Sequence, residues 1–303
     1  MAAVRVIATT ERGRSLVAAR AFVAGERVFR ERPLIHADPT APLGAAGAPR
    51  ALADRVLARL PLGALRESCA REGVRYPLLV AQMLVHSLTA SVDDGAGAGA
   101  PAAAAAAPAA AAAAPSFDDF WAAVAQLHAH VPQPPPARWA EQYALLRDAF
   151  CAPEARVRGA EQLFAPGALD ERWWRATLGA LHANLVRTDE RRVALLSVGS
   201  LLNHDCEPTL DFEFADDDAD APDVPSFGAR GVAELRARRA LRAGDELTIA
   251  YVRPPDAARR GGDGGHGGGA RAPLSGEERA QLRAAHGFDC ASCACASRER
   301  PPR

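Results

Sequence analysis

The chain contains 303 residues, carries a formal net charge of −1 at pH 7 and has 49% apolar residues. A chain of this length can bury a sizeable core in more than one folding unit, and its near-zero charge argues against electrostatic binding of nucleic acid or of a membrane surface. The basic residues are all arginine, which excludes Schiff-base and lysine general-base chemistry on the protein itself.

The N-terminal residues are not expected to form a signal peptide. The opening sequence MAAVRVIATTERGR lacks the apolar stretch of a signal peptide. The longest uncharged run, residues 95–117, consists mainly of alanine, glycine and proline, and its repeated prolines argue against a membrane span. We therefore expect a soluble intracellular protein.

Strand and helix patterns follow one another in blocks. The first 35 residues alternate short apolar stretches with turns, which is typical of strands. A long helical region follows, in which YPLLVAQMLVHSLTA and ARWAEQYALLRDAF carry apolar residues at helical spacing. Ser116 with Asp119, and Asp170, are expected to cap two of its helices. The Ala/Gly/Pro segment at about residues 95–115 offers little apolar surface, and we expect a disordered insertion there.

Strands are expected again after Arg187, in TLDFEF, GVAELRARRAL and DELTIAYV. Two similar segments, AFVAGERVFR and ALRAGDELTI, each place Ala-Gly and an acidic residue before a strand, as in a turn that leads into a sheet. A glycine-rich connector follows. Ser275 and Glu278 then form a predicted capping box for a helix that ends at His286 and leads to the last cysteines.

The cysteines indicate a metal site. Cys290, Cys293 and Cys295 lie in a tight cluster, which in an intracellular chain is more typical of a metal site than of disulfides. Tetrahedral zinc takes four nitrogen or sulfur ligands, so one is missing locally. Cys206, in the stretch SLLNHDCEP, is the distant candidate for it.

Two other interpretations of these cysteines stay open. In the first interpretation, the three clustered thiols are free in a mobile C-terminus. In the second, His204 and Cys206 form a catalytic pair. We regard this pair as the less favoured interpretation, because neighbouring side chains in an extended segment are expected to point to opposite faces.

Four separated motifs together resemble the SET-domain lysine methyltransferases. SLLNHDCEP is similar to the family's Asn-His-x-Cys-x-Pro motif, and GDELTIAY is similar to its Gly-Glu-Glu-Leu-x-x-x-Tyr strand. ERGRSLVAARAFVAGERVFRERPL lies near the N-terminus and GFDC precedes the last cysteines. Within the family the chain looks closest to the SET-and-MYND-like branch, which includes fungal members proposed to methylate histone H4, although it has no MYND finger.

The resemblance implies an α+β fold, namely a β-rich SET fold with its pseudoknot, a large helical insertion and a small zinc-binding post-SET tail. The corresponding domain boundaries divide the chain into four parts. Residues 1–35 and 185–255 form the two halves of the SET core, 36–184 form the helical insertion, and 256–303 form the glycine-rich linker and the cysteine-rich tail.

The resemblance also implies roles for individual residues. Tyr251 matches the tyrosine at the methyl-transfer site. Contacts to S-adenosylmethionine are implied for Gly13, Arg14, Ser15, Asn184, Asn203, His204, Tyr251 and Phe288. Structural zinc is implied at Cys206, Cys290, Cys293 and Cys295.

Several positions depart from the family pattern. Ser15 replaces the second glycine of a Gly-x-Gly turn, which would cost about 1 kcal/mol if the backbone needed a positive φ there. Thr209 stands where an asparagine is usual, and His286 where an aromatic commonly lines the lysine channel. The cysteines of the tail are spaced C-x-x-C-x-C in place of C-x-C-x-x-C.

The implied activity is S-adenosylmethionine-dependent protein-lysine N-methylation of a histone (H4-like) tail or of another lysine-containing peptide, in the nucleus, the cytoplasm or both. No direct binding of nucleic acid and no membrane association are expected. The alternative is a catalytically weak or inactive SET-fold interaction module with structural zinc. A plain zinc-binding scaffold is a third interpretation, which requires the Tyr251 and Asn203 matches to be accidental.

Overall fold

The computed structural model describes residues 3–10, 13–38, 48–72, 74, 76–93, 117–157, 159–189, 191–215, 227–228, 231–252 and 274–290. The chain divides into two compact units, which we call the strand unit and the helical unit. The strand unit comprises Met1–Glu31, Ser197–Ala221 and Gly231–Arg303, and the helical unit comprises Arg32–Leu196 and Pro222–Arg230. The four-part division inferred from the sequence stays a prediction.

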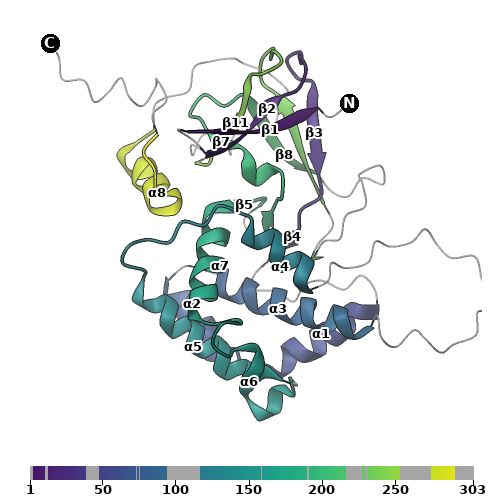
Figure 1. The fold of residues 1–303 in the computed structure, drawn as a ribbon, viewed down its shortest axis with the longest axis vertical. Coiled ribbons are helices and arrows are strands. Elements are labelled where there is room, and N and C mark those ends of the chain that lie inside the picture. Colours follow the sequence, from purple (N-terminus) through teal and green to yellow (C-terminus); the bar gives the residue numbers. More distant parts are fainter. Residues whose placement is uncertain are drawn as a thin grey trace, which may run out of the picture. The chain divides into compact units, whose positions relative to one another are not determined.

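The strand unit contains two small sheets (Figure 1). The first has the order β1-β2-β11-β7, and the second has the order β3-β10-β8. The first sheet is formed by β1 (Val4–Thr9), β2 (Gly13–Ala18), β11 (Glu246–Ile249) and β7 (Asn203–His204), and the second by β3 (Arg27–Glu31), β10 (Val232–Ala237) and β8 (Leu210–Ala215). A short 3₁₀ turn, η2 (Gly199–Leu201), precedes β7, and helix α8 (Gly276–His286) lies near the C-terminus.

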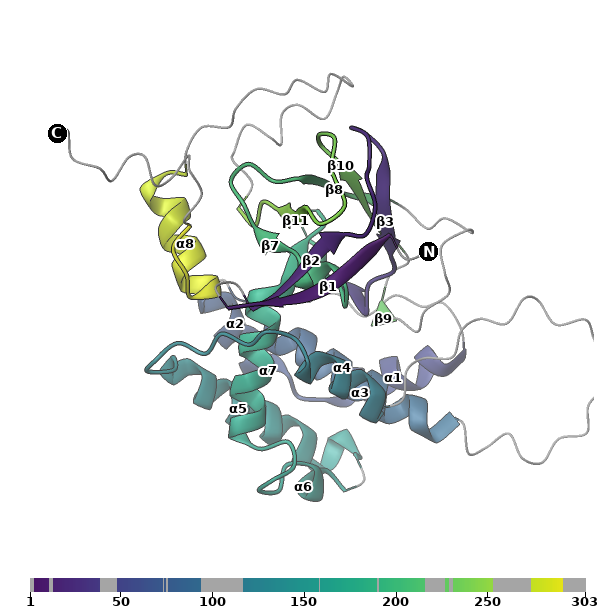
Figure 2. The same cartoon turned by 45° about the horizontal axis from the view of Figure 1, so that its top comes forward.

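The antiparallel pair β1–β2 ends at Gly13, which lies opposite Thr9 (Figure 2). Gly13 has a φ of 69°, a left-handed conformation that glycine adopts without steric cost. The following residues of β2 turn inward, and Leu16 and Ala18 are fully buried. The predicted strands of the N-terminal segment are therefore confirmed.

The two similar segments noted in the sequence form matching turns. Phe22 and Leu241, which occupy equivalent positions in the segments, pair through reciprocal backbone hydrogen bonds of 3.0 and 2.9 Å. Glu26 and Asp245 each accept a hydrogen bond from the backbone N–H three residues earlier, at 2.9 and 2.8 Å. Each turn leads into a strand, one into β3 and the other into β11, as the sequence indicated.

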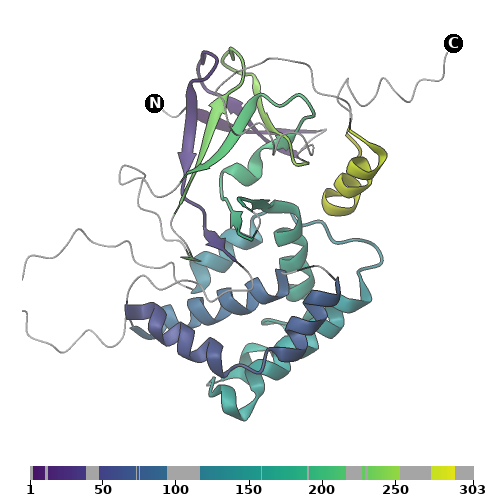
Figure 3. The ribbon, with the colours of Figure 1, turned by 180° about the vertical axis from the view of Figure 1, so that it is seen from behind.

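The helical unit packs seven helices of the described chain around an aromatic and aliphatic core (Figure 3). Trp174, Phe120 and Phe150 are the largest of its fully buried side chains, and the indole N–H of Trp174 donates to the backbone oxygen of Trp139 at 2.8 Å. The helices are α1 (Ala48–Arg59), α2 (Gly63–Glu72), α3 (Tyr76–Asp93), α4 (Phe117–Ala125), α5 (Ala137–Cys151), α6 (Ala160–Leu163) and α7 (Glu171–Asn184), with a 3₁₀ turn η1 (Pro153–Ala155).

The helical unit also contains a sheet that the sequence analysis missed. Its strand order is β5-β6-β4-β9. The strands are short, and each has too few residues to show a periodic pattern: β5 (Leu185–Arg187), β6 (Val193–Leu195), β4 (Ile35–Ala37) and β9 (Phe227–Gly228). Their pairing therefore depends on the tertiary structure.

Two predicted helix caps are confirmed. Asp170 accepts from the backbone N–H of Trp173 at 2.9 Å, and Ser275 and Glu278 form a reciprocal capping box at the start of α8. The predicted cap at Ser116, the Ala/Gly/Pro segment and the glycine-rich connector lie outside the described residues. No helix within the described ranges is both long and apolar enough to cross a membrane.

Gly179 is a position where close packing excludes a side chain. A Cβ added at Gly179 in α7 would lie 2.8 Å from the backbone oxygen of His130 and 3.0 Å from Cγ2 of Val131. We expect Gly179→Ala to lower the free energy of unfolding by about 1–3 kcal/mol, because overpacking outweighs the better helix propensity of alanine. Urea denaturation followed by circular dichroism measures this change.

Gly63→Ala is the matched control. Gly63 begins α2 in the same unit, and nothing lies within 4 Å of an added Cβ. This variant should be stabilised by up to about 1 kcal/mol. Equal effects of the two substitutions would contradict the assigned close packing at Gly179.

Candidate functional site

Three strands from distant parts of the chain meet in the first sheet of the strand unit. β7 pairs in parallel with β11, with Asn203 opposite Thr248 and His204 opposite Ile249. β11 in turn pairs antiparallel with β2, with Leu247 opposite Leu16. The pairing brings the Asn-His motif beside both the N-terminal strand and the strand that leads to Tyr251.

The side chain of Asn203 connects these three strands. Its Nδ2 donates to Oγ of Ser15 at 2.7 Å and to Oε1 of Glu246 at 2.9 Å. Ser15 is fully buried, whereas Asn203 is half-buried. Ser15 lies within β2, and among the described non-glycine residues only Arg156 has a positive φ. The strain considered for Ser15 is therefore absent, because its backbone is that of an ordinary strand.

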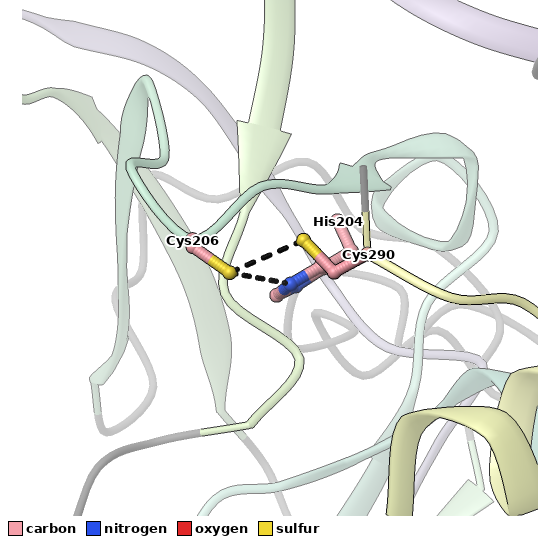
Figure 4. Close-up of side chains that lie close together, drawn as sticks. All are labelled: His204, Cys206 and Cys290. Atoms are coloured by element: carbon pink, nitrogen blue, oxygen red, sulfur yellow. Dashed lines mark hydrogen bonds between the residues drawn. The ribbon is translucent and has the colours of Figure 1, made fainter. Parts of the chain in front are cut away.

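His204 bridges Tyr251 and Cys206 through its two ring nitrogens. Nδ1 accepts a hydrogen bond from the backbone N–H of Tyr251 at 3.2 Å, and Nε2 lies 3.4 Å from Sγ of Cys206 (Figure 4). Because Nδ1 uses its lone pair as an acceptor, the proton of the neutral imidazole lies on Nε2. Nε2–H then donates toward the sulfur. Coordination of a metal through Nε2 would require loss of that proton.

The expectation that His204 and Cys206 point to opposite faces is wrong. The two residues are two positions apart, and side chains at that spacing in an extended segment lie on the same side. The histidine Nε2 and the sulfurs of Cys206 and Cys290 all lie within 4.8 Å of one another. His204 was predicted to contact a cofactor, and that role stays a prediction.

Cys206 and Cys290 come together from segments 84 residues apart, with their sulfurs at 3.2 Å (Figure 4). Two thiolates on one tetrahedral zinc, each at about 2.3 Å, would be separated by about 3.8 Å, whereas a disulfide requires about 2.05 Å. The observed distance and the soft sulfur donors fit a shared metal better than a disulfide. Cys293 and Cys295 lie outside the described residues.

Helix α8 delivers Cys290 to this position. Leu282 of α8 is 1% exposed and packs in one cluster with Cys206 and Leu274. The helix ends at Gly287, in a left-handed conformation, and Nε of Arg283 donates to Asp289 at 2.8 Å. These contacts turn the chain so that residues 288–290 approach the Asn-His motif.

Tyr251 lies in an aromatic cluster with His204, His286 and Phe288. The ring centroid of Tyr251 is 4.4 Å from that of His286, 5.4 Å from that of His204 and 6.3 Å from that of Phe288. Phe288 keeps 36% of its surface exposed, which leaves a face for a ligand. His286 is therefore part of this aromatic cluster, and its place in a lysine channel stays a prediction.

The hydroxyl of Tyr251 is held as a neutral donor. It donates to the backbone oxygen of Leu202 at 2.6 Å. Burial raises the pKa of Tyr251 to about 12, and the nearby carboxylate of Glu246 contributes to the increase. Tyr251 therefore remains protonated at physiological pH and cannot act as a general base. Because its proton is engaged by Leu202, its oxygen is left to accept hydrogen bonds.

Three other residues that were predicted to contact the cofactor lie outside the aromatic cluster around Tyr251. Gly13 and Arg14 lie at the exposed start of β2. Asn184 lies in the helical unit at the end of α7, where its Nδ2 donates to the backbone oxygens of His128 and Ala180, both at 2.7 Å. The cofactor contacts inferred for these residues stay predictions.

Sequence reasoning missed residues that support the site. Glu246 holds Asn203, and the backbone oxygen of Leu202 accepts from Tyr251. Thr209, which stands where the family usually has asparagine, exchanges hydrogen bonds with Thr248: its N–H donates to Oγ1 of Thr248 at 3.0 Å, and its own Oγ1 accepts from the Thr248 N–H at 2.8 Å. The acidic residue inside the GDELTIAY strand was the available signal for Glu246.

A comparison with known protein families finds a match. The SET domain model matches residues 13–252. The chain therefore belongs to the SET-domain family, and the α+β SET fold predicted from the sequence is confirmed.

Two solved structures are similar to this chain at low sequence identity. The SET domain of LSMT bound to lysine and AdoHcy has a TM-score of 0.43 at 14% identity, and LSMT bound to methyl-lysine and AdoHcy has a TM-score of 0.44 at 13% identity. Each match covers 95% of this chain. It covers 53% of the LSMT chain, so this chain spans about half the length of the LSMT chain. No curated protein matches.

The three tyrosines of the chain provide a test of the buried surroundings of Tyr251. Burial raises the pKa of Tyr76, Tyr143 and Tyr251 above 10, for Tyr251 to about 12. We expect the folded protein to show less tyrosinate absorbance at pH 10 than the protein in concentrated guanidinium chloride, in which the tyrosines titrate near pH 10.

The increase in the pKa of Tyr251 makes the free energy of unfolding depend on pH. Folding favours the neutral phenol, so the contribution of Tyr251 to the free energy of unfolding is fully present below pH 10 and is lost as the pH rises through about 12. A folded protein that shows three normal tyrosine titrations near pH 10 would contradict the buried position of Tyr251.

Proposed function

We propose that this protein is an S-adenosylmethionine-dependent protein-lysine N-methyltransferase. The observation that carries the proposal is the position of Tyr251. Its strand lies beside the Asn-His motif, its hydroxyl donates to the backbone oxygen of Leu202, and its ring borders an aromatic cluster. This arrangement lies within a chain that matches the SET domain.

The chemistry of Tyr251 suits amine methylation. S-adenosylmethionine, when bound, supplies an electrophilic methyl group on a sulfonium. A lysine amine has a pKa of about 10.4 and is mostly charged at pH 7, so an apolar, aromatic channel that disfavours the charged form promotes the neutral amine. The Tyr251 oxygen would accept an N–H from that amine and orient its lone pair. The rings of the aromatic cluster would stabilise the positive charge of the sulfonium.

The residues around Asn203 suit the cofactor. The half-buried amide of Asn203 provides a polar contact, and the exposed face of Phe288 provides an apolar one for a base. Gly13, Arg14 and Ser15 at the start of β2 would provide backbone groups to the same ligand. His204 completes the proposed cofactor set within the strand unit, and the cofactor contact that the sequence resemblance implies for Asn184 stays a prediction.

Zinc would be held by Cys206 and Cys290 together with Cys293 and Cys295. The approach of the first two sulfurs supports this assignment. The Nε2–H of His204 would donate to the Cys206 thiolate and stabilise its charge, an arrangement typical of groups that surround metal ligands. The metal would be structural, and it would hold the end of α8 beside Tyr251.

Finer parts of the proposal rest on the motifs of the sequence. These are membership of the SET-and-MYND-like branch without the MYND finger, similarity to fungal histone-H4-directed enzymes, a histone-tail or other lysine-containing substrate, and a nuclear or cytoplasmic location. No direct contact with nucleic acid is part of the proposal.

The second candidate function is an interaction module that keeps the fold and the zinc but lacks turnover. The altered cysteine spacing favours this candidate.

Tyr251→Phe tests the enzyme proposal. Purified protein is incubated with methyl-labelled S-adenosylmethionine and core histones, and methyl-lysine is quantified. We expect the substitution to lower the turnover by about 10²-fold, because the amine loses its orienting acceptor, and to leave cofactor affinity nearly unchanged. The chain itself has no lysine, so automethylation of lysine adds no background.

Tyr143→Phe is the control for this substitution. The Tyr143 hydroxyl also donates to a backbone oxygen, that of Leu169 at 3.0 Å, but it lies in the helical unit. Its turnover should match the wild type. Cofactor binding by the wild type without methyl transfer to histones or to a lysine-rich peptide mixture would favour the interaction module.

Cys206→Ser tests the zinc assignment. Elemental analysis of the purified wild type should give about one zinc per chain, and the substitution should remove it because a hydroxyl is a much weaker zinc ligand than a thiolate. Cys151→Ser in the helical unit should retain the metal. A wild type without zinc, or a Cys206→Ser variant that retains it, would contradict the assignment.

A further inference from the structure

The orientation of the Asn203 side-chain amide is determined by its neighbours. An ionised carboxylate can only accept hydrogen bonds, so the group of Asn203 that faces Oε1 of Glu246 at 2.9 Å must be the NH₂ group. Ser15 Oγ, at 2.7 Å, accepts the second hydrogen of the same NH₂ group. Both donors of Asn203 are therefore used inside the protein.

The consequence is that Oδ1 of Asn203 is left as the group that meets a ligand. A carbonyl oxygen accepts hydrogen bonds and repels another acceptor, so it recognises an N–H or O–H donor and disfavours a carboxylate. Without Glu246, the amide could rotate by 180° and present NH₂, which would reverse this preference. The two internal hydrogen bonds thus determine which chemical group the site prefers.

Ser15 and Glu246 lie in paired strands, which hold them in fixed positions beside the Asn203 amide. Ser15 belongs to β2 and is fully buried, and Glu246 begins β11, which pairs with both β2 and β7. Their positions are thus determined by strand pairing. The carboxylate of Glu246 lies 2.9 Å from Nδ2 of Asn203, and its negative charge also favours a cation near Asn203.

We propose that Ser15 and Glu246 are positioning residues that hold Oδ1 of Asn203 toward the ligand, so that the site selects the α-ammonium group of the amino-acid portion of the cofactor. This inference rests on the proposed function, since it assumes that Asn203 contacts the cofactor. It also changes the interpretation of Ser15. The hydroxyl that replaces a glycine of the family pattern is a hydrogen-bonding part of the site.

The test compares two ligands that differ in the amino-acid portion, which carries the α-ammonium group and a carboxylate. S-adenosylhomocysteine carries the α-ammonium group, whereas 5′-methylthioadenosine keeps the adenosine and the thioether but lacks the amino-acid portion. Isothermal titration calorimetry gives the affinity of the full-length protein for each ligand. The ratio of the two affinities reports on recognition of the amino-acid portion and is insensitive to a loss of folded protein.

Glu246→Gln is the main variant because it is isosteric. Glutamine can present its own NH₂ to Asn203, so the amide orientation is no longer imposed. We expect the affinity for S-adenosylhomocysteine to fall by about 10- to 100-fold, the range of a hydrogen bond to a charged group, with the affinity for 5′-methylthioadenosine changed less than about twofold. Ser15→Ala should lower the ratio by about two- to tenfold, because Glu246 still holds one hydrogen.

Glu213→Gln is the control with the same chemical change. Glu213 is exposed on β8 of the same unit and should leave both affinities unaltered. An unchanged affinity ratio in Glu246→Gln would overturn the inference, and so would an equal loss for both ligands, which indicates a general structural role. If the wild type binds neither ligand, the proposed function itself fails, and that outcome is distinct from the other two.

Discussion

The parallel pairing of β7 with β11 is the constraint on which the rest of the site depends. β7 has only two residues, Asn203 and His204, and each lies opposite a residue of β11. So short a strand has little stability of its own, and its register is set by what surrounds it. On one side, Asn203 donates to Ser15 and Glu246, and on the other, His204 accepts from the backbone of Tyr251.

The polar groups of this region serve both stability and chemistry. A buried polar atom without a partner costs free energy, so the hydrogen bonds of Asn203 and Ser15 are needed for folding. The same bonds decide which atom of Asn203 faces outward. Burial of Tyr251 has a comparable double effect, because it raises the phenol pKa to about 12 and thereby keeps the hydroxyl a neutral donor to Leu202.

The sulfur pair and the aromatic cluster are adjacent because His204 belongs to both. Its ring lies 5.4 Å from that of Tyr251, and its Nε2 lies 3.4 Å from Sγ of Cys206. The segment that follows helix α8 contributes Cys290 to the sulfur pair and Phe288 to the aromatic cluster. The imidazole ring of His204 therefore contacts both the sulfur pair and the surroundings of Tyr251.

The sequence by itself determined the class of fold, the helix caps at Asp170 and Ser275, and the matching turns before β3 and β11. It also singled out the motif residues Asn203, Cys206 and Tyr251. These features depend on local periodicity, on capping geometry and on motifs read within a few residues. The tertiary structure alone decided that Ser15 has ordinary strand geometry, that His204 and Cys206 share a side, and that Glu246 orients Asn203. Asn203 and Ser15 are 188 residues apart. Contacts at such separation follow from strand register, which no local pattern in this chain specifies.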